Sequence, residues 1–240
     1  AQIVYYVWAA LRLGAPEHPV AFAVPTGNFG NVFAAHAARR MGLPISRLLV
    51  GSNRNDILAR FFASGEMRIG DVHPTLSPSM DIQISSNFER YLFELCGEDG
   101  GRVRNVMREF RETGRFAVAP EAFRRARADF AAERCDDDET KTIIRAVHDE
   151  RGRLVDPHTA IGIAAARRRR AEIKGPIVAV GTAHPAKFPD AVAAATGIVP
   201  ALPPRLANLF ERAERYRVLP NDTGALKRTI VEVLTNRGSM

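Results

Sequence analysis

The sequence has little cysteine and no long apolar run. Its 240 residues include two cysteines, Cys96 and Cys135, which give neither a disulfide framework nor a metal-binding spacing. Two unpaired thiols are typical of a reducing compartment, so we expect a cytoplasmic protein with no metal site. No apolar segment approaches the roughly 20 residues that a membrane-spanning helix needs, and we expect no membrane partner.

The first residues also lack the marks of a secretion signal. The stretch "AQIVYYVWAALRLGAP" has no basic segment before its apolar part, and Arg12 interrupts it. Ile3, Val7 and Leu11 recur at intervals of four, which predicts a buried helix. The predicted helix starts at residue 1 without a cap, and we therefore expect the chain to be part of a longer protein.

The chain is basic but carries no nucleic-acid motif. The formal net charge is +7, and most of the arginines are scattered among acidic residues. The densest basic run, Arg167–Arg170, lies near the end of a predicted helix, where cations complement the helix dipole. A solvated helix end explains this run without a ligand, and we expect no nucleic-acid partner.

The apolar pattern predicts an α/β fold. Strands are predicted at 21–24, 47–50 and 176–180, with a helix at 31–40 between the first two. A strand–helix–strand order gives parallel strands joined by right-handed crossovers. A long helical insertion is predicted from Asn87 onward. Other predicted helices are at 56–63, 88–95, 103–113, 120–133, 139–149, 157–170 and 184–196, and two more helical stretches follow.

A glycine-containing turn, "VPTGNFGN", joins the first strand to its helix. A helix N-terminus presents free N–H groups and about half a positive charge. Gly27 and Gly30 would let the backbone approach an anion, since glycine has no side chain and tolerates positive φ. Asn28 could adopt the left-handed conformation or donate its amide, and Asn31 adds a polar group. The spacing matches neither the Walker A loop nor the dinucleotide fingerprint, so a phosphate cradle and a plain structural turn both remain open.

Four further motifs follow the glycine turn along the chain. They are "NRND" at 53–56, "PSMDIQISSNFERYLFEL" at 78–95, "DPHTAIG" at 156–162 and "VGTAHPAKFPDAV" at 180–192. Together with the glycine turn, these motifs resemble the threonine synthase family of pyridoxal-phosphate enzymes. The resemblance covers nearly the whole chain. It implies the parallel-sheet cofactor domain of the fold type II, or tryptophan synthase β-like, class.

The resemblance implies two contacts with pyridoxal 5'-phosphate. Five consecutive residues would hold its phosphate: Gly27, Asn28, Phe29, Gly30 and Asn31. Thr182 would place its hydroxyl against the pyridine nitrogen. It follows the predicted strand "IVAVG", at the end where open α/β sheets collect ligands. From the residues alone, Thr182 is equally a helix N-cap.

Three polar residues precede the helix predicted after Asn87. They are Ser85, Ser86 and Asn87. From the residues alone, Ser86 or Asn87 could simply cap that helix. The resemblance offers a second interpretation, in which all three face the phosphate of the substrate.

Four more polar residues lie close to these motifs. Asn53 and Asn55 follow a predicted strand and either line a pocket or cap the next helix. His158 and His184 each lie beside a helix start and are predicted to be structural.

The lysines do not include one that fits the cofactor chemistry. A pyridoxal enzyme needs a lysine that forms an imine with the cofactor aldehyde. The chain has Lys141, Lys174, Lys187 and Lys227, and the family's imine lysine belongs to a segment that precedes the counterpart of Ala1. Lys187 lies near the ring-nitrogen contact, which is on a different side of the pyridine from the aldehyde. We therefore expect no catalytic residue in this chain, and no activity from the chain alone.

The resemblance implies the function of the whole enzyme. A threonine synthase is a lyase of threonine biosynthesis that converts O-phospho-L-homoserine and water to L-threonine and phosphate. Residues 1–240 would form one cofactor-binding domain, the C-terminal half, whose partners are the missing N-terminal segment and a small phosphorylated amino acid. The arginine-rich composition suggests a bacterial source. Two alternatives remain open: another fold type II lyase of the serine or threonine dehydratase kind, and a non-catalytic module that binds pyridoxal phosphate or phosphate.

Overall fold

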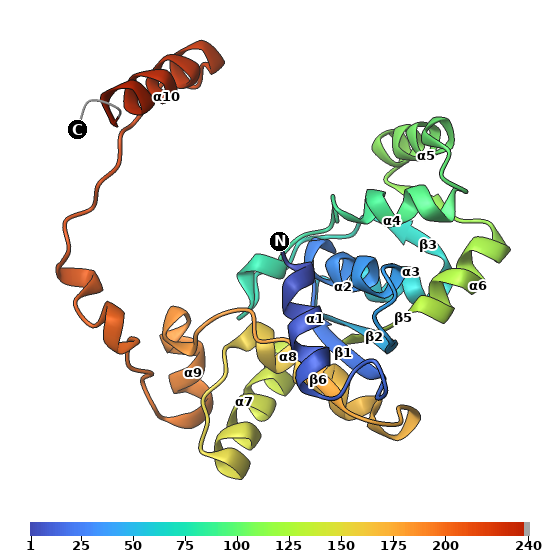
Figure 1. Cartoon of the computed structure of the whole chain (residues 1–240), viewed down its shortest axis with the longest axis horizontal. Coiled ribbons are helices and arrows are strands. Elements are labelled where there is room, and N and C mark those ends of the chain that lie inside the picture. The colour runs from blue at the N-terminus through green and yellow to red at the C-terminus, as the bar shows by residue number, and fades with distance from the viewer. Residues whose placement is uncertain (238–240) are drawn as a thin grey trace. The chain divides into compact units, whose positions relative to one another are not determined.

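The computed structural model describes residues 1–237 (Figure 1). Ala1–Ala201 form one compact unit, and the chain from Leu202 onward forms a second. The prediction of one domain over 1–240 includes residues 238–240, which lie outside the described residues, and it stays a prediction. Among the described residues no helix is both long and apolar enough to cross a membrane.

A four-stranded parallel sheet is the centre of the first unit. Its strand order is β5 (Phe130–Arg134), β2 (Ile45–Ser52), β1 (Val20–Pro25) and β6 (Ile177–Ala179), and each neighbouring pair is parallel. Every residue of β1 is buried because helices cover both faces of the sheet. The predicted parallel α/β fold is confirmed.

The same unit contains nine α-helices. They are α1 (Ile3–Arg12), α2 (Gly30–Arg40), α3 (Ile57–Ser64), α4 (Phe88–Leu95), α5 (Gly100–Thr113), α6 (Pro120–Asp129), α7 (Asp137–Arg151), α8 (Pro157–Arg168) and α9 (Pro189–Thr196), counted over the described part of this unit. The side chains on the two faces of β1 differ in size. Phe22 and Val24 pack into the large core with residues of α1 to α4, whereas Ala21 and Ala23 share a smaller cluster with Ala165 of α8. The small side chains let α8 lie close to the strands.

The helix predicted at 120–133 is wrong after Asp129. Residues Phe130–Arg134 form β5, which pairs with β2 from Leu48 to Ser52. No glycine or proline separates α6 from β5, so the sequence gives no sign of the change. Pairing with an open sheet edge overrides the helical preference of this segment.

A pair of short strands was also not predicted, and its second strand interrupts the helical insertion predicted from Asn87 onward. β3 (Glu66–Arg68) and β4 (Arg115–Ala117) form a separate antiparallel pair. The helix predicted at 184–196 is divided into a 3-10 turn at Pro185–Lys187 and α9, which begins at Pro189. Proline cannot donate an intrahelical hydrogen bond, and this explains the break.

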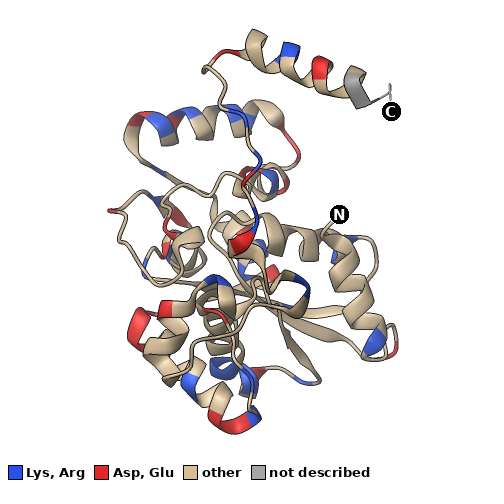
Figure 2. Cartoon of the chain, turned by 90° about the vertical axis from the view of Figure 1, so that its left-hand side faces the viewer, with Lys and Arg blue, Asp and Glu red and all other residues tan. Residues whose placement is uncertain are grey.

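Arginines of the basic run Arg167–Arg170 form ion pairs with nearby glutamates. Arg168 contacts Glu133 and Glu139, and Arg169 contacts Glu133 and Glu172. Figure 2 shows acidic and basic residues interspersed over the helices. The run therefore stabilises the end of α8, as its position in the sequence indicates.

The second unit contains 3-10 turns at Pro204–Leu206 and Leu209–Glu211 and the helix α10 (Thr223–Arg237). None of its described side chains, through Thr235, is fully buried. Phe210, Tyr216 and Val218 are among its exposed apolar residues. This unit therefore presents apolar surface.

Candidate functional site

The turn between β1 and α2 is fixed by its own phenylalanine. Phe29, and not Asn28, adopts the left-handed conformation, with φ of 64°. A left-handed non-glycine residue needs support from its surroundings. The Phe29 ring is fully buried and contacts four other aromatic rings, those of Phe62, Phe88, Tyr91 and Phe130. The side chain thus anchors the turn in the core.

The two glycines of this turn are needed for close packing. Neither Gly27 nor Gly30 has a positive φ, so the expected conformational role is not used. A Cβ on Gly27 would lie 3.0 Å from the Cα of Met80, and a Cβ on Gly30 would lie 3.1 Å from the Nδ2 of Asn87. The backbone of Met80 and the side chain of Asn87 therefore pack closely against the turn.

Asn31 is oriented by a buried tyrosine. The hydroxyl of Tyr6 donates to the Oδ1 of Asn31 at 2.7 Å and to its backbone oxygen at 3.0 Å. Burial raises the pKa of Tyr6, so the phenol stays protonated and remains a donor. With its oxygen occupied, the Asn31 side chain has its NH2 group as a donor for a ligand.

The predicted substrate segment contacts the predicted phosphate turn. Ser86 donates to the Oδ1 of Asn28 at 2.8 Å, and the backbone N–H of Asn87 lies 3.3 Å from the Asn28 carbonyl oxygen. The side chain of Asn87 makes no capping bond to α4, although it occupies the N-cap position. The Oγ of Ser85 is buried without a hydrogen-bond partner among the described residues. The capping interpretation therefore does not account for these residues.

Ser86 and Asn87 face a groove between α2, α4 and α5. Its volume is about 1030 Å³. Four arginines line it, namely Arg40, Arg90, Arg104 and Arg111, together with Glu89, Glu94 and Glu98. Arg40 is paired with Glu94 and Glu98. Because Ser86 lines this groove and donates to Asn28, the groove and the glycine turn are neighbours.

A smaller cavity joins the glycine turn to Thr182. It has a volume of about 190 Å³. Its walls come from four separate parts of the chain: Pro25, Gly27, Asn31, Ser79, Met80, His158, Thr182, Ala183, Lys187 and Phe188. Pro25 ends β1 and Thr182 follows β6, so the cavity lies at the carboxyl ends of parallel strands.

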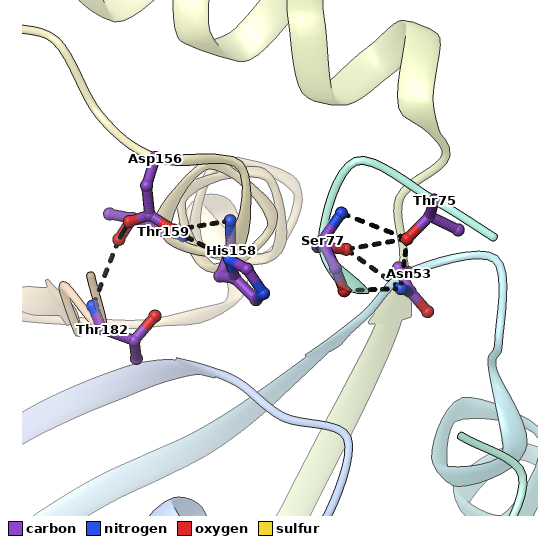
Figure 3. A network of polar contacts seen from close by, with 7 residues as sticks. All are labelled: Asn53, Thr75, Ser77, Asp156, His158, Thr159 and Thr182. Carbon is purple, nitrogen blue, oxygen red and sulfur yellow. Dashed lines mark hydrogen bonds and ion pairs between the residues drawn. The ribbon is translucent and has the colours of Figure 1, made fainter. Parts of the chain in front are cut away.

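Thr182 is held by a hydrogen-bonded chain that starts at Asp156 (Figure 3). Its N–H donates to the Oγ1 of Thr159 at 3.2 Å, and the Thr159 hydroxyl donates to the Asp156 carboxylate. The 3-10 turn that follows is capped by His184, whose Nδ1 accepts from Ala186. The N-cap interpretation of Thr182 is therefore wrong, and the structural role predicted for His184 is confirmed.

The Asp156 carboxylate is the centre of this network. It caps α8, as the sequence predicts, and accepts from the backbone N–H of His158 at 2.9 Å. Its burial raises the pKa of Asp156, but hydrogen bonds from His158 and Thr159 outweigh that effect and the net pKa is lowered. Asp156 is therefore an ionised acceptor at neutral pH.

His158 is only partly the structural histidine that the sequence predicts. Its Nδ1 lies 3.0 Å from Asp156 Oδ1, whereas its Nε2 is buried without a hydrogen-bond partner in the described chain. The ring packs against Phe188 at a centroid distance of 4.8 Å. Lys187, on the same cavity, is exposed, and its Nζ lies 5.6 Å from the Phe188 ring centroid.

Asn53, which Figure 3 shows beside Thr75 and Ser77, and Asn55 shape the loop that forms one wall of the cavity. The Nδ2 of Asn53 donates to Thr75, Ser77 and Asp81 over 2.8–2.9 Å. Asn55 exchanges hydrogen bonds with the backbone of His73. Both side chains are buried. They therefore fix the loop that brings Ser79 and Met80 to the cavity, and neither is among the residues that line it.

Replacing Asn53 with alanine is expected to lower the free energy of unfolding by about 2 kcal/mol, because Thr75, Ser77 and Asp81 lose a shared buried donor. Urea unfolding followed by circular dichroism measures the change. Asn105→Ala, at an exposed position on α5, is the matched control and should change stability little. Equal stability of the two variants would contradict this role for Asn53.

Ser79, Met80 and Phe188 were not predicted as site residues. Ser79 and Met80 belong to the "PSMD" motif and Phe188 to "HPAKF", so the resemblance marked the segments without giving them a role. Nothing in the sequence shows that these segments meet. Among the described residues, no group of three or more histidine, cysteine or acidic side chains is arranged to hold a metal ion.

Comparison with known proteins identifies the family. A family model described as threonine synthase, C-terminal, matches residues 159–230. The threonine synthase of Pseudomonas aeruginosa is 50% identical over 99% of this chain and 51% of that protein. The threonine synthase of Corynebacterium glutamicum is 43% identical over 98% of this chain and 50% of that protein.

Solved structures of threonine synthases are also similar to this chain. The crystal structure of pyridoxal-phosphate-bound threonine synthase from Brucella melitensis has a TM-score of 0.89 and 48% identity, and the match covers 95% of this chain and 49% of that one. The yeast threonine synthase structure has a TM-score of 0.83 and 35% identity, with 98% and 52% covered.

The fold and the site define the class of this chain. Its parallel sheet, with a glycine turn and a polar loop meeting at the strand ends, is that of the fold type II pyridoxal-phosphate enzymes. Within that class, the chain corresponds to the C-terminal portion of threonine synthase, and the resemblance predicted from the five motifs is confirmed. The chain spans about half the length of the curated relatives it matches.

Proposed function

We propose that this chain is the cofactor-binding part of a threonine synthase. The complete enzyme would convert O-phospho-L-homoserine and water to L-threonine and phosphate with pyridoxal phosphate. The observation that carries the proposal is the cavity that the glycine turn shares with Thr182. The similarity to threonine synthases over nearly the whole chain supports it.

The residues around the cavity fit a phosphorylated pyridine. The phosphate would be held at the start of α2 by Gly27, Asn28, Phe29, Gly30 and Asn31. The backbone there is pinned by the buried Phe29 ring, and the NH2 group of Asn31 adds a donor. Such fixed donors need no reorganisation when the anion arrives.

Thr182 would contact the ring nitrogen with its hydroxyl. That hydroxyl makes no hydrogen bond within residues 1–237, so it is free to pair with a ligand. A hydroxyl, unlike a carboxylate, does not force the nitrogen to stay protonated. When bound, pyridoxal phosphate supplies an electron sink for the α-carbon of an amino-acid substrate. Thr182 would keep that sink mild and hold the ring in place.

The phosphate of the substrate would bind at Ser85, Ser86 and Asn87. Ser86 is one hydrogen bond away from Asn28, so substrate and cofactor phosphates would occupy adjacent sites. The unpartnered Oγ of Ser85 and the arginines of the neighbouring groove support an anionic ligand here.

The rest of the enzyme would supply the imine lysine and cover the open edge of the sheet. β6 pairs with β1 alone among the described strands, which leaves its other edge free. Beside it, α1 exposes Val4, Tyr5 and Trp8. We propose that the N-terminal segment of the same polypeptide packs here, and that the enzyme works in the cytoplasm in threonine biosynthesis.

The chain alone is expected to be inactive, because none of its lysines fits the imine position. Assays of the 240-residue chain with O-phospho-L-homoserine and pyridoxal phosphate should release no phosphate above background. The complete reading frame around this sequence should release phosphate from that substrate and prefer it to serine. A preference for serine would overturn the proposed function. Borohydride reduction that labels one lysine of this chain would overturn its predicted inactivity.

A further inference from the structure

The imidazole of His158 has an unused nitrogen at the cavity. Four buried side-chain polar atoms lack a hydrogen-bond partner among the described residues: the Nδ1 of His36, the Oγ of Ser52, the Oγ of Ser85 and the Nε2 of His158. Of these residues, His158 lines the cavity between the glycine turn and Thr182. Buried polar atoms are rarely left unpaired, so a buried nitrogen beside a cavity points to a ligand.

The hydrogen bonds of His158 determine what that nitrogen offers. Nδ1 lies 3.0 Å from the carboxylate of Asp156, which is completely buried. An ionised carboxylate is only an acceptor, so Nδ1 carries the proton. In the neutral imidazole, Nε2 then bears a lone pair. In that form, the Nε2 of this cavity-lining residue is a hydrogen-bond acceptor.

The same carboxylate fixes His158 relative to Thr182. Asp156 binds the His158 ring and, through Thr159, the backbone of Thr182. Packing of the ring against Phe188, with 5% of His158 exposed, keeps the imidazole from turning toward bulk water. Figure 3 shows Asp156, His158, Thr159 and Thr182 as one connected group. One buried carboxylate thus positions two residues that line the same cavity, His158 and Thr182.

We propose that His158 is a ligand-binding residue of this cavity, whose Nε2 accepts a hydrogen bond from a donor on the ring end of a phosphorylated pyridine. Asp156 is the positioning residue that fixes the tautomer. This inference rests on the proposed function and adds to it a second ring contact beside Thr182. It also explains a buried nitrogen that would otherwise have no partner.

Nuclear magnetic resonance of the ¹⁵N-labelled 240-residue chain tests the inference without an activity assay, because it observes the histidine ring nitrogens and the backbone amides directly. The probe is 4'-deoxypyridoxine 5'-phosphate, which lacks the aldehyde and so needs no lysine. In the free chain we expect the Nδ1–H tautomer of His158. Adding the probe should shift the backbone amides of 27–31 and the Nε2 of His158, whereas inorganic phosphate should leave Nε2 unchanged.

The outcomes separate the two proposals. Shifts at both places support both proposals. Shifts at 27–31 without any change at Nε2 overturn the role of His158 and leave the proposed function intact. If neither place responds at saturating probe, the proposed cofactor site is wrong and the inference falls with it.

Variants give a second readout. His158→Phe should weaken binding of the probe about tenfold, the effect of one lost hydrogen bond in a preformed site. His158→Gln should keep affinity within about threefold of the parent chain, since its amide oxygen is an acceptor near the same place. The matched control is His148→Phe on α7, because His148 also lies beside a carboxylate, 3.5 Å from Asp149, but is partly exposed and away from the cavity. Circular dichroism confirms that each variant is folded. If His158→Phe binds the probe as tightly as the parent chain, the inference is refuted.

Discussion

Gly27→Val is expected to weaken binding of 4'-deoxypyridoxine 5'-phosphate about 100-fold, a change of roughly 2.7 kcal/mol in binding free energy. Even a single Cβ at this position would lie 3.0 Å from the Cα of Met80 and 3.4 Å from the Ile82 side chain. Met80 belongs to the loop held by Asn53, so it has little freedom to move. A branched side chain must therefore displace the turn or fill the cavity. Isothermal titration calorimetry measures the affinity.

Two further variants separate lost binding from lost folding. Gly100→Val adds the same side chain at a glycine with nothing within 4 Å of its added Cβ, and it should bind the probe normally. Asn31→Asp keeps an oxygen that accepts from Tyr6, but it places a carboxylate beside the phosphate. Like charges in a partly buried site repel strongly, so Asn31→Asp should also weaken binding by at least about tenfold. If Asn31→Asp is folded and binds at full affinity, the phosphate is not held at this turn.

The glycine turn shows how far local sequence predicts a site. A helix N-terminus after a buried strand suggested an anion cradle, because the required chemistry lies in consecutive residues, but it left a plain structural turn open, and the phosphate role came from the family resemblance. The detailed geometry was not predictable in the same way. Phe29 adopts the left-handed conformation because its ring enters a core made by Phe88 and Phe130, which are far away in the sequence. A conformation that depends on distant packing leaves no local pattern.

Neither the strand state of β5 nor the unpaired Nε2 of His158 was predicted, and the reasons are related. β5 follows α6 without a breaking residue, and its strand state depends on the exposed edge of β2. His158 follows a helix N-cap, which is an ordinary place for a structural histidine. Its unpaired Nε2 becomes visible only when Phe188 and the loop with Met80 are placed around it. Periodicity predicts which elements form, whereas contacts between distant segments decide what each element does.

Asp156→Ala is expected to be the most destabilising substitution in this site, lowering the free energy of unfolding by about 3 kcal/mol. The change leaves the N–H groups of His158 and Thr159 and the Thr159 hydroxyl without their buried acceptor. For a chain of this size, the midpoint of thermal unfolding should fall by about 9 °C. Asp99→Ala is the matched control, since Asp99 caps α5 in the same way but is exposed. It should cause a clearly smaller loss, and equal losses would contradict the buried role of Asp156.

The stability that Asp156 provides should also depend on pH. The pKa of Asp156 is lowered in the folded chain, so the folded state binds its proton less readily than the unfolded state. Its contribution is therefore complete above the ordinary aspartate pKa of about 3.9, and it is lost as the pH falls through the lower, folded-state pKa. Asp156→Asn keeps one acceptor oxygen but cannot titrate. Urea unfolding of the parent chain and of Asp156→Asn should therefore differ most above about pH 5, and the difference should shrink as the pH is lowered toward about 3. A difference that stays constant over this range would show that Asp156 does not act as a carboxylate, and the tautomer inferred for His158 would lose its basis.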